Sequence, residues 1–280
     1  MPLNRRDAFK LVAVTAAGGT LMSRTAFAAE TAATEASLMP GADVCVITPE
    51  VTEGPYYFDP ALERVDITEG HQGVATTVKL QVVDATCRPI EGARVDIWHC
   101  NAAGVYSGYA NQTDGADATG QTFLRGTLFA GVDGIVEFQT IYPGWYAGRT
   151  THIHFKVFLD TTQVLTGQIF FPDALSQFLY QNVEPYKTRG ADRETLNAND
   201  RIAGQATRAS FAYVKELADR YLVAMIVGVD PNATSTASLM PGGDGGAPPP
   251  DGAFGSGDGA MSFPATEASV SLVPGSKGIR

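Results

Sequence analysis

The amino-acid sequence predicts an all-β protein with a two-layer β-sandwich core, short helices and a disordered C-terminal tail. Two observations support this fold class. From about residue 74, short runs alternate apolar and polar residues at every second position, and turns rich in Gly, Pro and Asp separate these runs. With 280 residues, the chain is long enough to bury the core of one domain.

Each expected strand is a short run in which apolar residues dominate or recur at every second position, with turn residues at its ends. Short strands at this spacing favour a two-layer sandwich over a parallel sheet. We expect the run at 163–171 to pair antiparallel with the run at 152–159. In chain order the expected strands lie at 78–82, 94–97, 135–140, 152–159, 163–171 and 221–229, and a short helix lies at 173–180.

The two ends of the chain differ from this core and divide the sequence into three parts. Residues 1–28 contain paired arginines, an apolar run and a small-x-small cleavage pattern at 26–28, which together resemble a twin-arginine export signal. A membrane anchor is the alternative, but spanning a bilayer takes roughly 20 apolar residues. Residues 29–230 are expected to form the sandwich domain, and residues 231–280, rich in Gly, Pro, Ser and Ala, the tail. We therefore expect an exported protein, periplasmic or extracellular, with no membrane span in the mature chain.

Charge and cysteine content narrow the partners and the compartment. Residues 1–28 hold four basic residues and one acidic residue, so their removal changes the formal net charge from −10 to −13. This acidity disfavours binding to nucleic acid and to anionic membranes. Three cysteines fit an oxidising compartment with one disulfide and one free thiol. A strand at 93–100 would separate Cys87 from Cys100, so Cys45 is the expected partner of one of them, and the sequence leaves open which.

The most informative cluster contains Tyr146, Arg149, His152 and His154, and it holds two of the four histidines of the chain. In a strand, alternation sends the apolar residues into the core and both imidazoles to the opposite face. Two histidines on one strand face can bind one metal ion, and the nearby Arg149 favours the neutral, metal-binding form of both. The alternative is a pair of half-buried histidines bonded to their neighbours. The residues expected in the core are Ile153, Phe155, Val157 and Leu159.

A second cluster follows the strand at 94–97 and places Tyr106 on a loop just beyond a strand end, where functional side chains are commonly displayed. Two imidazoles and two phenols form a hard, anionic ligand set that suits a ferric ion, whereas structural zinc gathers thiolates and ferrous oxygenases use two histidines and a carboxylate. The sequence resembles the intradiol ring-cleavage dioxygenases, the non-haem ferric family that includes catechol and protocatechuate dioxygenases. The resemblance covers about residues 48–200 and rests on Thr52-Glu53-Gly54-Pro55-Tyr56-Tyr57, Asp96-Ile97-Trp98-His99 with Gly104-Val105-Tyr106-Ser107, Pro143-Gly144-Trp145-Tyr146, and Arg149-Thr150-Thr151-His152-Ile153-His154.

This resemblance implies one non-haem Fe(III) ion per chain, and it assigns the ligands. Tyr106 and His152 would be equatorial, and Tyr146 and His154 axial. The implied enzyme takes a small aromatic diol and O2 and cleaves the catechol ring between its two hydroxylated carbons, which gives a cis,cis-muconate-type diacid. Tyr146 would take up one proton of the incoming diol. The resemblance also assigns two pocket residues, a charge-stabilising arginine and a bordering glutamine: Arg149 and Gln168.

Other candidate residues have two interpretations each. The pair Tyr56-Tyr57 either lines the substrate pocket or packs as part of an ordinary turn. His99 alternates with apolar neighbours, so a core histidine bonded to the backbone is favoured over a metal ligand. Tyr142 competes as the second phenol, and the Pro-Gly-x-Tyr pattern favours Tyr146 instead. His71 lies in a polar turn and is expected at the surface.

Two features depart from the better known members of that family. Only five residues separate Tyr146 from His152, where those proteins have a longer loop that shapes the pocket. We therefore expect an open pocket able to accept substituted or bulky catechols. Residues 29–47 are short and polar where catechol dioxygenases have a helical dimerisation segment, so their oligomeric arrangement does not carry over, and the sequence leaves a homo-oligomer open.

Two other classes of protein share parts of this pattern. An exported, non-catalytic β-sandwich of the transthyretin-like or carbohydrate-binding type would explain the strands and the signal, but not the combination of two tyrosines and two histidines. A cupin-type metalloenzyme would need a carboxylate and a further histidine downstream, and no histidine follows His154. The dioxygenase interpretation explains more of the sequence than either.

Overall fold

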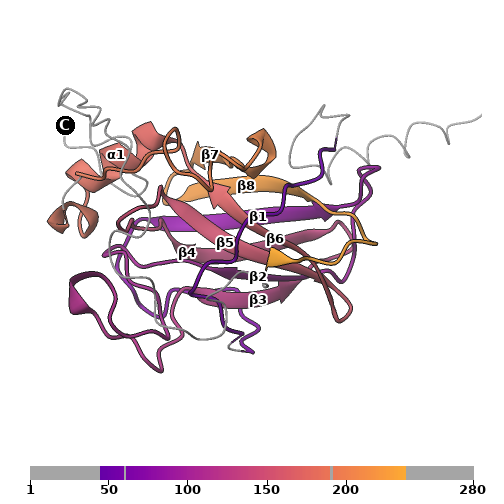
Figure 1. The fold of residues 1–280 in the computed structure, drawn as a ribbon, viewed down its shortest axis with the longest axis horizontal. Helices are drawn as coiled ribbons and strands as arrows, with labels where there is room; N and C mark the ends of the chain where they lie inside the picture. Colours follow the sequence, from indigo (N-terminus) through magenta and orange to yellow (C-terminus); the bar gives the residue numbers. More distant parts are fainter. Residues whose placement is uncertain (1–44, 60, 190–191, 238–280) are drawn as a thin grey trace, which may run out of the picture. The chain divides into compact units, whose positions relative to one another are not determined.

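The computed structural model describes residues 45–59, 61–189 and 192–237, which form two packed four-stranded sheets (Figure 1). Sheet A has the strand order β4-β1-β8-β7, and sheet B has the order β3-β2-β5-β6. The predicted all-β sandwich is confirmed. The export signal at 1–28 and residues 238–280 of the predicted tail lie outside the described residues. In chain order the strands are β1 (Ala75–Val83), β2 (Arg94–Trp98), β3 (Arg125–Phe129), β4 (Ile135–Ile141), β5 (His152–Leu159), β6 (Thr162–Phe170), β7 (Tyr213–Glu216) and β8 (Tyr221–Gly228).

The six predicted strands and the predicted helix are all present, the helix as α1 (Asp173–Asn182). β5 and β6 pair antiparallel as expected. The sequence did not indicate β3 and β7, which are short and mix charged residues with apolar ones. It also gave no sign that β1 and β8 pair in parallel, which makes sheet A a mixed sheet.

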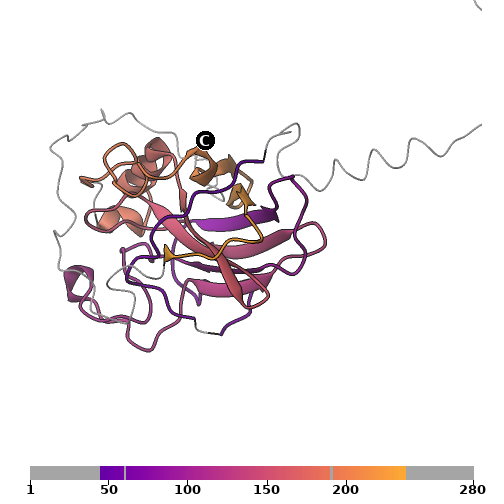
Figure 2. The ribbon, with the colours of Figure 1, turned by 45° about the vertical axis from the view of Figure 1, so that its right-hand side comes forward.

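Three further short segments are 3-10 helices at Thr113–Gly115, Tyr186–Thr188 and Arg208–Ser210. Figure 2 shows α1 and the segment that follows it gathered beside one end of the strands. Among the described residues, no helix is long and apolar enough to cross a membrane.

The core lies between the two sheets, and β5 contributes one of its most buried rows. Ile153, Phe155 and Val157 have no exposed surface, as the alternation predicted. His152, His154 and Lys156 lie on the opposite face of the strand and are at most 2% exposed. The sequence did not predict that this second face would be buried as well.

A stretch of chain at 51–57, here termed the cover segment, buries the outer face of β5 and β6. Thr52 O accepts a hydrogen bond from Gln168 Nε2 on β6 (3.0 Å). Glu53 forms an ion pair with Lys156 on β5, with both side chains at most 7% exposed. A row of polar side chains on a central strand therefore lies inside the protein, where each must find a partner.

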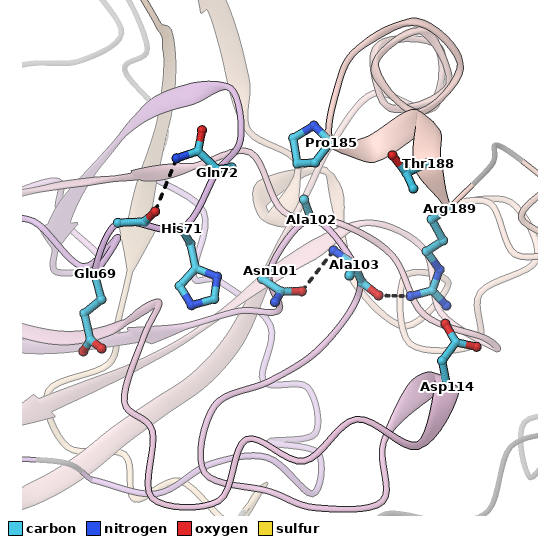
Figure 3. Close-up of a pocket in the computed structure, with 11 residues that line it drawn as sticks. Glu69, His71, Gln72, Asn101, Ala102, Ala103, Asp114, Pro185, Thr188 and Arg189 are labelled. Carbon is cyan, nitrogen blue, oxygen red and sulfur yellow. Dashed lines mark hydrogen bonds between the residues drawn. The ribbon is translucent and has the colours of Figure 1, made fainter.

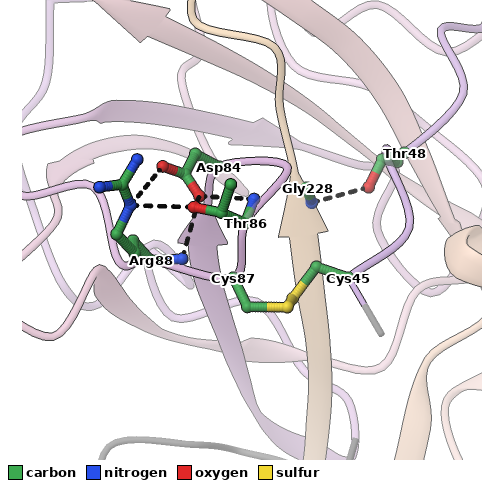
Figure 4. The surroundings of a disulfide bond; sticks show 7 residues. All are labelled: Cys45, Thr48, Asp84, Thr86, Cys87, Arg88 and Gly228. Carbon is green, nitrogen blue, oxygen red and sulfur yellow. Dashed lines mark hydrogen bonds and ion pairs between the residues drawn. A yellow bond between two sulfur atoms is a disulfide. The ribbon is translucent and has the colours of Figure 1, made fainter. Parts of the chain in front are cut away.

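The Cys45–Cys87 disulfide ties the start of the described chain to the turn after β1 (Figure 4). Beside it, Thr48 N donates to Gly228 O (2.9 Å), and Gly228 N donates to Thr48 Oγ1 (3.1 Å). Cys100 is a buried free thiol. The prediction that Cys45 pairs with one of the other cysteines is confirmed, and the partner that the sequence left open is Cys87.

Residues 231–237, which the sequence places in the tail, are described and lie against the sandwich. Ser235 N donates to Gln163 O (2.8 Å), and Thr236 N donates to Glu50 Oε1 (2.9 Å). The hydrogen-bonded part of the chain therefore extends at least that far.

Removing the disulfide is expected to destabilise the fold. The bond joins residues 42 apart, and a closed loop of that size restricts the unfolded chain by about 4 kcal/mol. We expect the double variant Cys45→Ser, Cys87→Ser to lose up to this amount of unfolding free energy in urea denaturation. Cys100→Ala is the control for loss of a thiol. A double variant as stable as the wild type would contradict the prediction.

Candidate metal centre

β5 places His152 and His154 on one face, with their Nε2 atoms 3.0 Å apart. His154 pairs across the sheet with Trp98 on one side and Gln168 on the other. Its ring stacks on the Trp98 indole, with centroids 4.8 Å apart and planes 9° apart. At Gly54 in the cover segment the backbone has φ +72°, and a Cβ there would meet the His154 ring at 3.4 Å. These contacts fix the orientation of the imidazole.

Two tyrosines approach the same point from two loops. Tyr106 Oη lies 3.3 Å from His152 Nε2, and Tyr146 Oη lies 3.2 Å from it. The two loops pack back to back through glycines: a Cβ on Gly104 would collide with the backbone of Trp145, and one on Gly144 with the 101–102 backbone. The glycines in both tyrosine motifs are therefore needed for the close approach of the loops.

Tyr106 is the more firmly held of the two phenols. Its N donates to Gln112 Oε1 (2.7 Å), and Gln112 Nε2 donates back to Tyr106 O (2.7 Å). The tyrosine is 1% exposed, whereas Tyr146 is half-buried beside the exposed Ala147. No sequence pattern indicated the role of Gln112.

The tautomer of His152 shows why these atoms crowd together. His152 Nδ1 lies 2.7 Å from Thr150 O, and a carbonyl oxygen only accepts, so Nδ1 carries the proton and Nε2 carries a lone pair. Three polar atoms, Tyr106 Oη, Tyr146 Oη and His154 Nε2, lie 3.0–3.3 Å from this nitrogen. The single lone pair of His152 Nε2 cannot accept a hydrogen bond from all three. Donor atoms at right angles around one first-row ion, each at about 2.0–2.1 Å from it, lie about 3 Å apart. The four donors therefore fit a shared metal ion.

The electrostatics of the four donors also favour a cation. Burial, and then Arg149, lowers the pKa of His152 to about 3, and burial followed by His152 lowers the pKa of His154. Both imidazoles are thus neutral, the form that binds metals. Burial raises the pKa of both Tyr106 and Tyr146. A bound cation reverses this effect and stabilises phenolate, and phenolate oxygen with imidazole nitrogen suits a ferric ion.

Carboxylates are not part of this donor set. Within the described ranges, no three His, Cys, Asp or Glu side chains are grouped to hold a metal ion. The oxygen donors beside the two imidazoles are phenols. This arrangement differs from the ligand sets that the cupin alternative requires.

Arg149 and Gln168 lie beside the donors, and a carboxylate that the sequence did not indicate joins them. Arg149 Nη2 donates to Gln168 Oε1 (2.5 Å), and Arg149 Nε donates to Asp200 Oδ2 (2.9 Å). Burial alone would raise the pKa of Asp200, but Arg149 and backbone N–H donors outweigh it and lower the pKa. Asp200 is remote in sequence and belongs to no recognisable motif, so only the structure could reveal it.

The structure separates the two tyrosines of the cover segment. The Tyr56 ring stacks on Tyr106, with centroids 4.3 Å apart and planes 10° apart, and so forms part of the wall around the donors. The Tyr57 hydroxyl instead donates to Asp96 Oδ2 (2.9 Å), and Lys156 Nζ lies 3.8 Å from the ring centroid. Pocket lining therefore suits Tyr56, and packing suits Tyr57.

The other aromatic candidates lie away from the donors. The Tyr142 hydroxyl is buried against Ser176 Oγ (2.8 Å). His99 is a core histidine as predicted: its Nδ1 donates to Cys100 O (2.8 Å), and its Nε2 accepts from Thr140 Oγ1 (2.7 Å). The expected choice of Tyr146 over Tyr142 agrees with this geometry.

A surface pocket of about 630 Å³ lies elsewhere, between the turns at 69–72 and 101–103 and the segment at 185–189 (Figure 3). None of the four donor residues lines it. His71 does, so it lies at the surface as expected; it is half-buried, with its ring centroid 3.9 Å from that of Phe123. The main polar residues that line this surface pocket are Glu69, His71, Gln72, Asn101, Asp114 and Arg189.

Comparison with known proteins identifies the family. A sequence model described as Dioxygenase matches residues 52–183, a stretch that contains all four donors. The fold is similar to that of an intradiol ring-cleavage dioxygenase from Tetranychus urticae, with a TM-score of 0.63 and 32% identity, and the match covers 69% of this chain and 98% of that one. The chain belongs to the intradiol ring-cleavage dioxygenase family.

Characterised bacterial proteins are further relatives of this intradiol dioxygenase chain. It is 29% identical over 144 residues to catechol 1,2-dioxygenase 1 of Acinetobacter lwoffii, and the aligned stretch covers 43% of this chain and 45% of that protein. It is 30% identical over 169 residues to a chlorocatechol 1,2-dioxygenase of Cupriavidus pinatubonensis, and the aligned stretch covers 52% of this chain and 60% of that protein. The chain thus spans about half the length of the curated relatives it matches.

The burial of His99 predicts a pH-dependent stability. Loss of hydration lowers its pKa from 6.5 to about 4 in the fold. Below pH 6.5 the unfolded state binds more protons, so the stability that depends on neutral His99 is complete above pH 6.5 and is lost as the pH falls toward 4, by about 2 kcal/mol at pH 5. Urea denaturation at pH 7 and at pH 5 gives the loss of unfolding free energy between the two. This loss should be about 2 kcal/mol smaller in His99→Gln than in the wild type. Parallel pH profiles would contradict the assignment.

Proposed function

We propose that this protein is an exported intradiol dioxygenase. In this proposal Tyr106, Tyr146, His152 and His154 bind one Fe(III) ion, and O2 cleaves a catechol-type substrate between its two hydroxylated carbons to a cis,cis-muconate-type diacid. The observation that carries it is the convergence of two phenol oxygens and one imidazole nitrogen within 3.3 Å of a second imidazole nitrogen whose lone pair is free. Family membership supports enzymatic function, since other members are dioxygenases.

A bound ferric ion supplies the Lewis acidity that makes a catecholate ring reactive toward O2. Tyr146, half-buried at the edge of its loop, is the donor best placed to yield to the substrate, and its Oη takes one of the substrate protons. Tyr106 stays in place because Gln112 holds its backbone on both sides. Arg149, buried and charged, stabilises the negative charge that develops on the ring.

The short loop after Tyr146 and the export-like signal support the proposed substrate class and compartment. The loop between Tyr146 and His152 has five residues, and its Ala147 is exposed, which supports a proposed pocket that opens on the Tyr146 side of the donors. An open site suits substituted or bulky catechols as well as catechol itself. The twin-arginine-like signal supports export, and that route carries proteins that fold, and can acquire a metal, before they cross the membrane.

Tyrosinate coordination can be tested by colour and turnover. Protein loaded with Fe(III) should be red-purple from tyrosinate-to-iron charge transfer and should cleave catechol in the presence of O2. Tyr106→Phe should shift or bleach this colour and lower turnover about 100-fold or more, because one donor of the charge-stabilising site is lost. Tyr142→Phe removes a buried phenol that bonds Ser176 instead, and should keep both properties. A colourless protein that binds sugars would favour the non-catalytic sandwich, and an unchanged spectrum in Tyr106→Phe would remove Tyr106 from the ligand set.

The open site predicts tolerance of ring substituents. We expect kcat/KM for catechols that carry a bulky group at the 4 position to be comparable to, or higher than, kcat/KM for unsubstituted catechol. Oxygen uptake with a substituent series provides the measurement. Cleavage of catechol alone would contradict an open pocket while leaving the metal centre intact.

A further inference from the structure

Arg149 is held from two sides, and this leaves one of its nitrogens available. Asp200 accepts from Nε and Gln168 accepts from Nη2, while Nη1 has no hydrogen bond among the described residues. The Arg149 side chain is 4% exposed and the Asp200 side chain 1%. The direction of the remaining N–H edge is therefore set by the two partners rather than by solvent.

Asp200 is itself fully engaged. Its Oδ2 also accepts from Thr150 N (2.8 Å), and its Oδ1 accepts from Ile202 N (2.8 Å) and Ala203 N (2.9 Å). A carboxylate with this many N–H donors has one position, so it acts as a fixed anchor for the guanidinium. The anchor also reaches a metal-binding residue, because Thr150 O is the partner that sets the tautomer of His152.

The segment that carries Asp200 holds the loop at a second point. Asn197 Oδ1 lies 2.9 Å from Thr150 Oγ1, and Asn197 Nδ2 donates to Phe171 O (2.8 Å). Both Asn197 and Asp200 lie beyond residue 183, where the match to the family model ends. A part of the chain outside that match therefore supports the five-residue loop.

The charge of Asp200 has its own effect on the site. A buried guanidinium beside the four donors repels a second cation, and a trivalent ion most of all. Asp200 offsets that charge through its ion pair with Arg149 Nε, so that the pair as a whole is neutral. Asp200 thus both orients the Arg149 guanidinium and balances its charge.

We propose that Asp200 is a positioning residue, which aims Arg149 at the bound substrate. This inference rests on the proposed function, in which Arg149 acts on the substrate. Asp200 is not one of the four donors, and it influences turnover through the guanidinium that its Oδ2 holds. The loss of its carboxylate therefore lowers turnover through the displacement of Arg149.

A double-mutant cycle tests this dependence. Iron-loaded Asp200→Asn is expected to keep the colour, to keep KM for catechol close to that of the wild type, and to lose about 100-fold in kcat because the guanidinium is misplaced. Arg149→Ala should also keep the colour and lose most of its turnover. The double variant should be no slower than Arg149→Ala alone, because a positioning residue has nothing left to position. Losses that multiply would overturn the proposal.

Asp84→Asn is the control. Asp84 is also a carboxylate that accepts backbone N–H bonds, from Thr86 N (2.7 Å) and Arg88 N (3.0 Å), and pairs with an arginine, Arg88 (3.1 Å), but it lies in the turn after β1 and has no contact with Arg149. Its substitution is expected to leave kcat nearly unchanged and to combine independently with Arg149→Ala. If Asp200→Asn fails to fold, Asp200→Glu keeps the charge and displaces it by one methylene group, and it should show the same dependence on Arg149 with a smaller loss, about tenfold. Wild-type kcat in Asp200→Glu would also overturn the proposal.

Crystal structures of metal-free wild type and Asp200→Asn provide a readout that needs no activity. The Arg149 guanidinium should leave its place beside Gln168 in the variant, and an unmoved guanidinium would refute the positioning role. If the wild type has neither colour nor turnover, the proposed function fails, and these structures still decide whether Asp200 positions Arg149.

Discussion

The candidate centre depends on the burial of both faces of β5. One face packs Ile153, Phe155 and Val157 into the sandwich, and this fixes the strand in sheet B. The other face carries His152 and His154, enclosed by the cover segment and the two tyrosine loops. Burial keeps both imidazoles neutral and without competing water, so their lone pairs are available to a metal ion. An ordinary half-exposed strand would have offered the same residues without this state of ionisation.

Burying a polar row requires partners, and the chain supplies them as pairs. Lys156 pairs with Glu53 on one side of the histidines, and Arg149 pairs with Asp200 on the other. Buried pairs of this kind need not add to stability, since desolvation offsets much of their attraction. Removing one partner, however, leaves a charge inside the protein. The pairs therefore specify one arrangement of the strand and its neighbours around the donors.

The sequence predicted the features that depend on local pattern. Alternation located six of the eight strands and put the two histidines on one face. The motif order singled out Tyr106 and Tyr146, which the structure brings to the same point. The missed features depend on contacts that no motif marks. The clamp of Gln112 on Tyr106 closes a turn of six residues, whereas the anchor at Asp200 and the parallel pairing of β1 with β8 join distant parts of the chain. No local pattern encodes these, because each partner is an ordinary loop or strand residue until the fold brings it close. The packing of His71 on Phe123 was missed for the same reason, since that ring is distant in sequence.

The disulfide gives the cover segment a second role. Cys45 stands just before this segment, and its bond to Cys87 fastens the segment to the turn after β1. At its other end the segment is fastened by the stacking of Tyr56 on Tyr106. The cover segment above the donor atoms is thus fastened at both ends, and at one of them by a covalent bond. In a reducing medium the disulfide opens, and noncovalent contacts, among them the Glu53–Lys156 ion pair and the Tyr56 stacking, are then all that hold the segment over the donors.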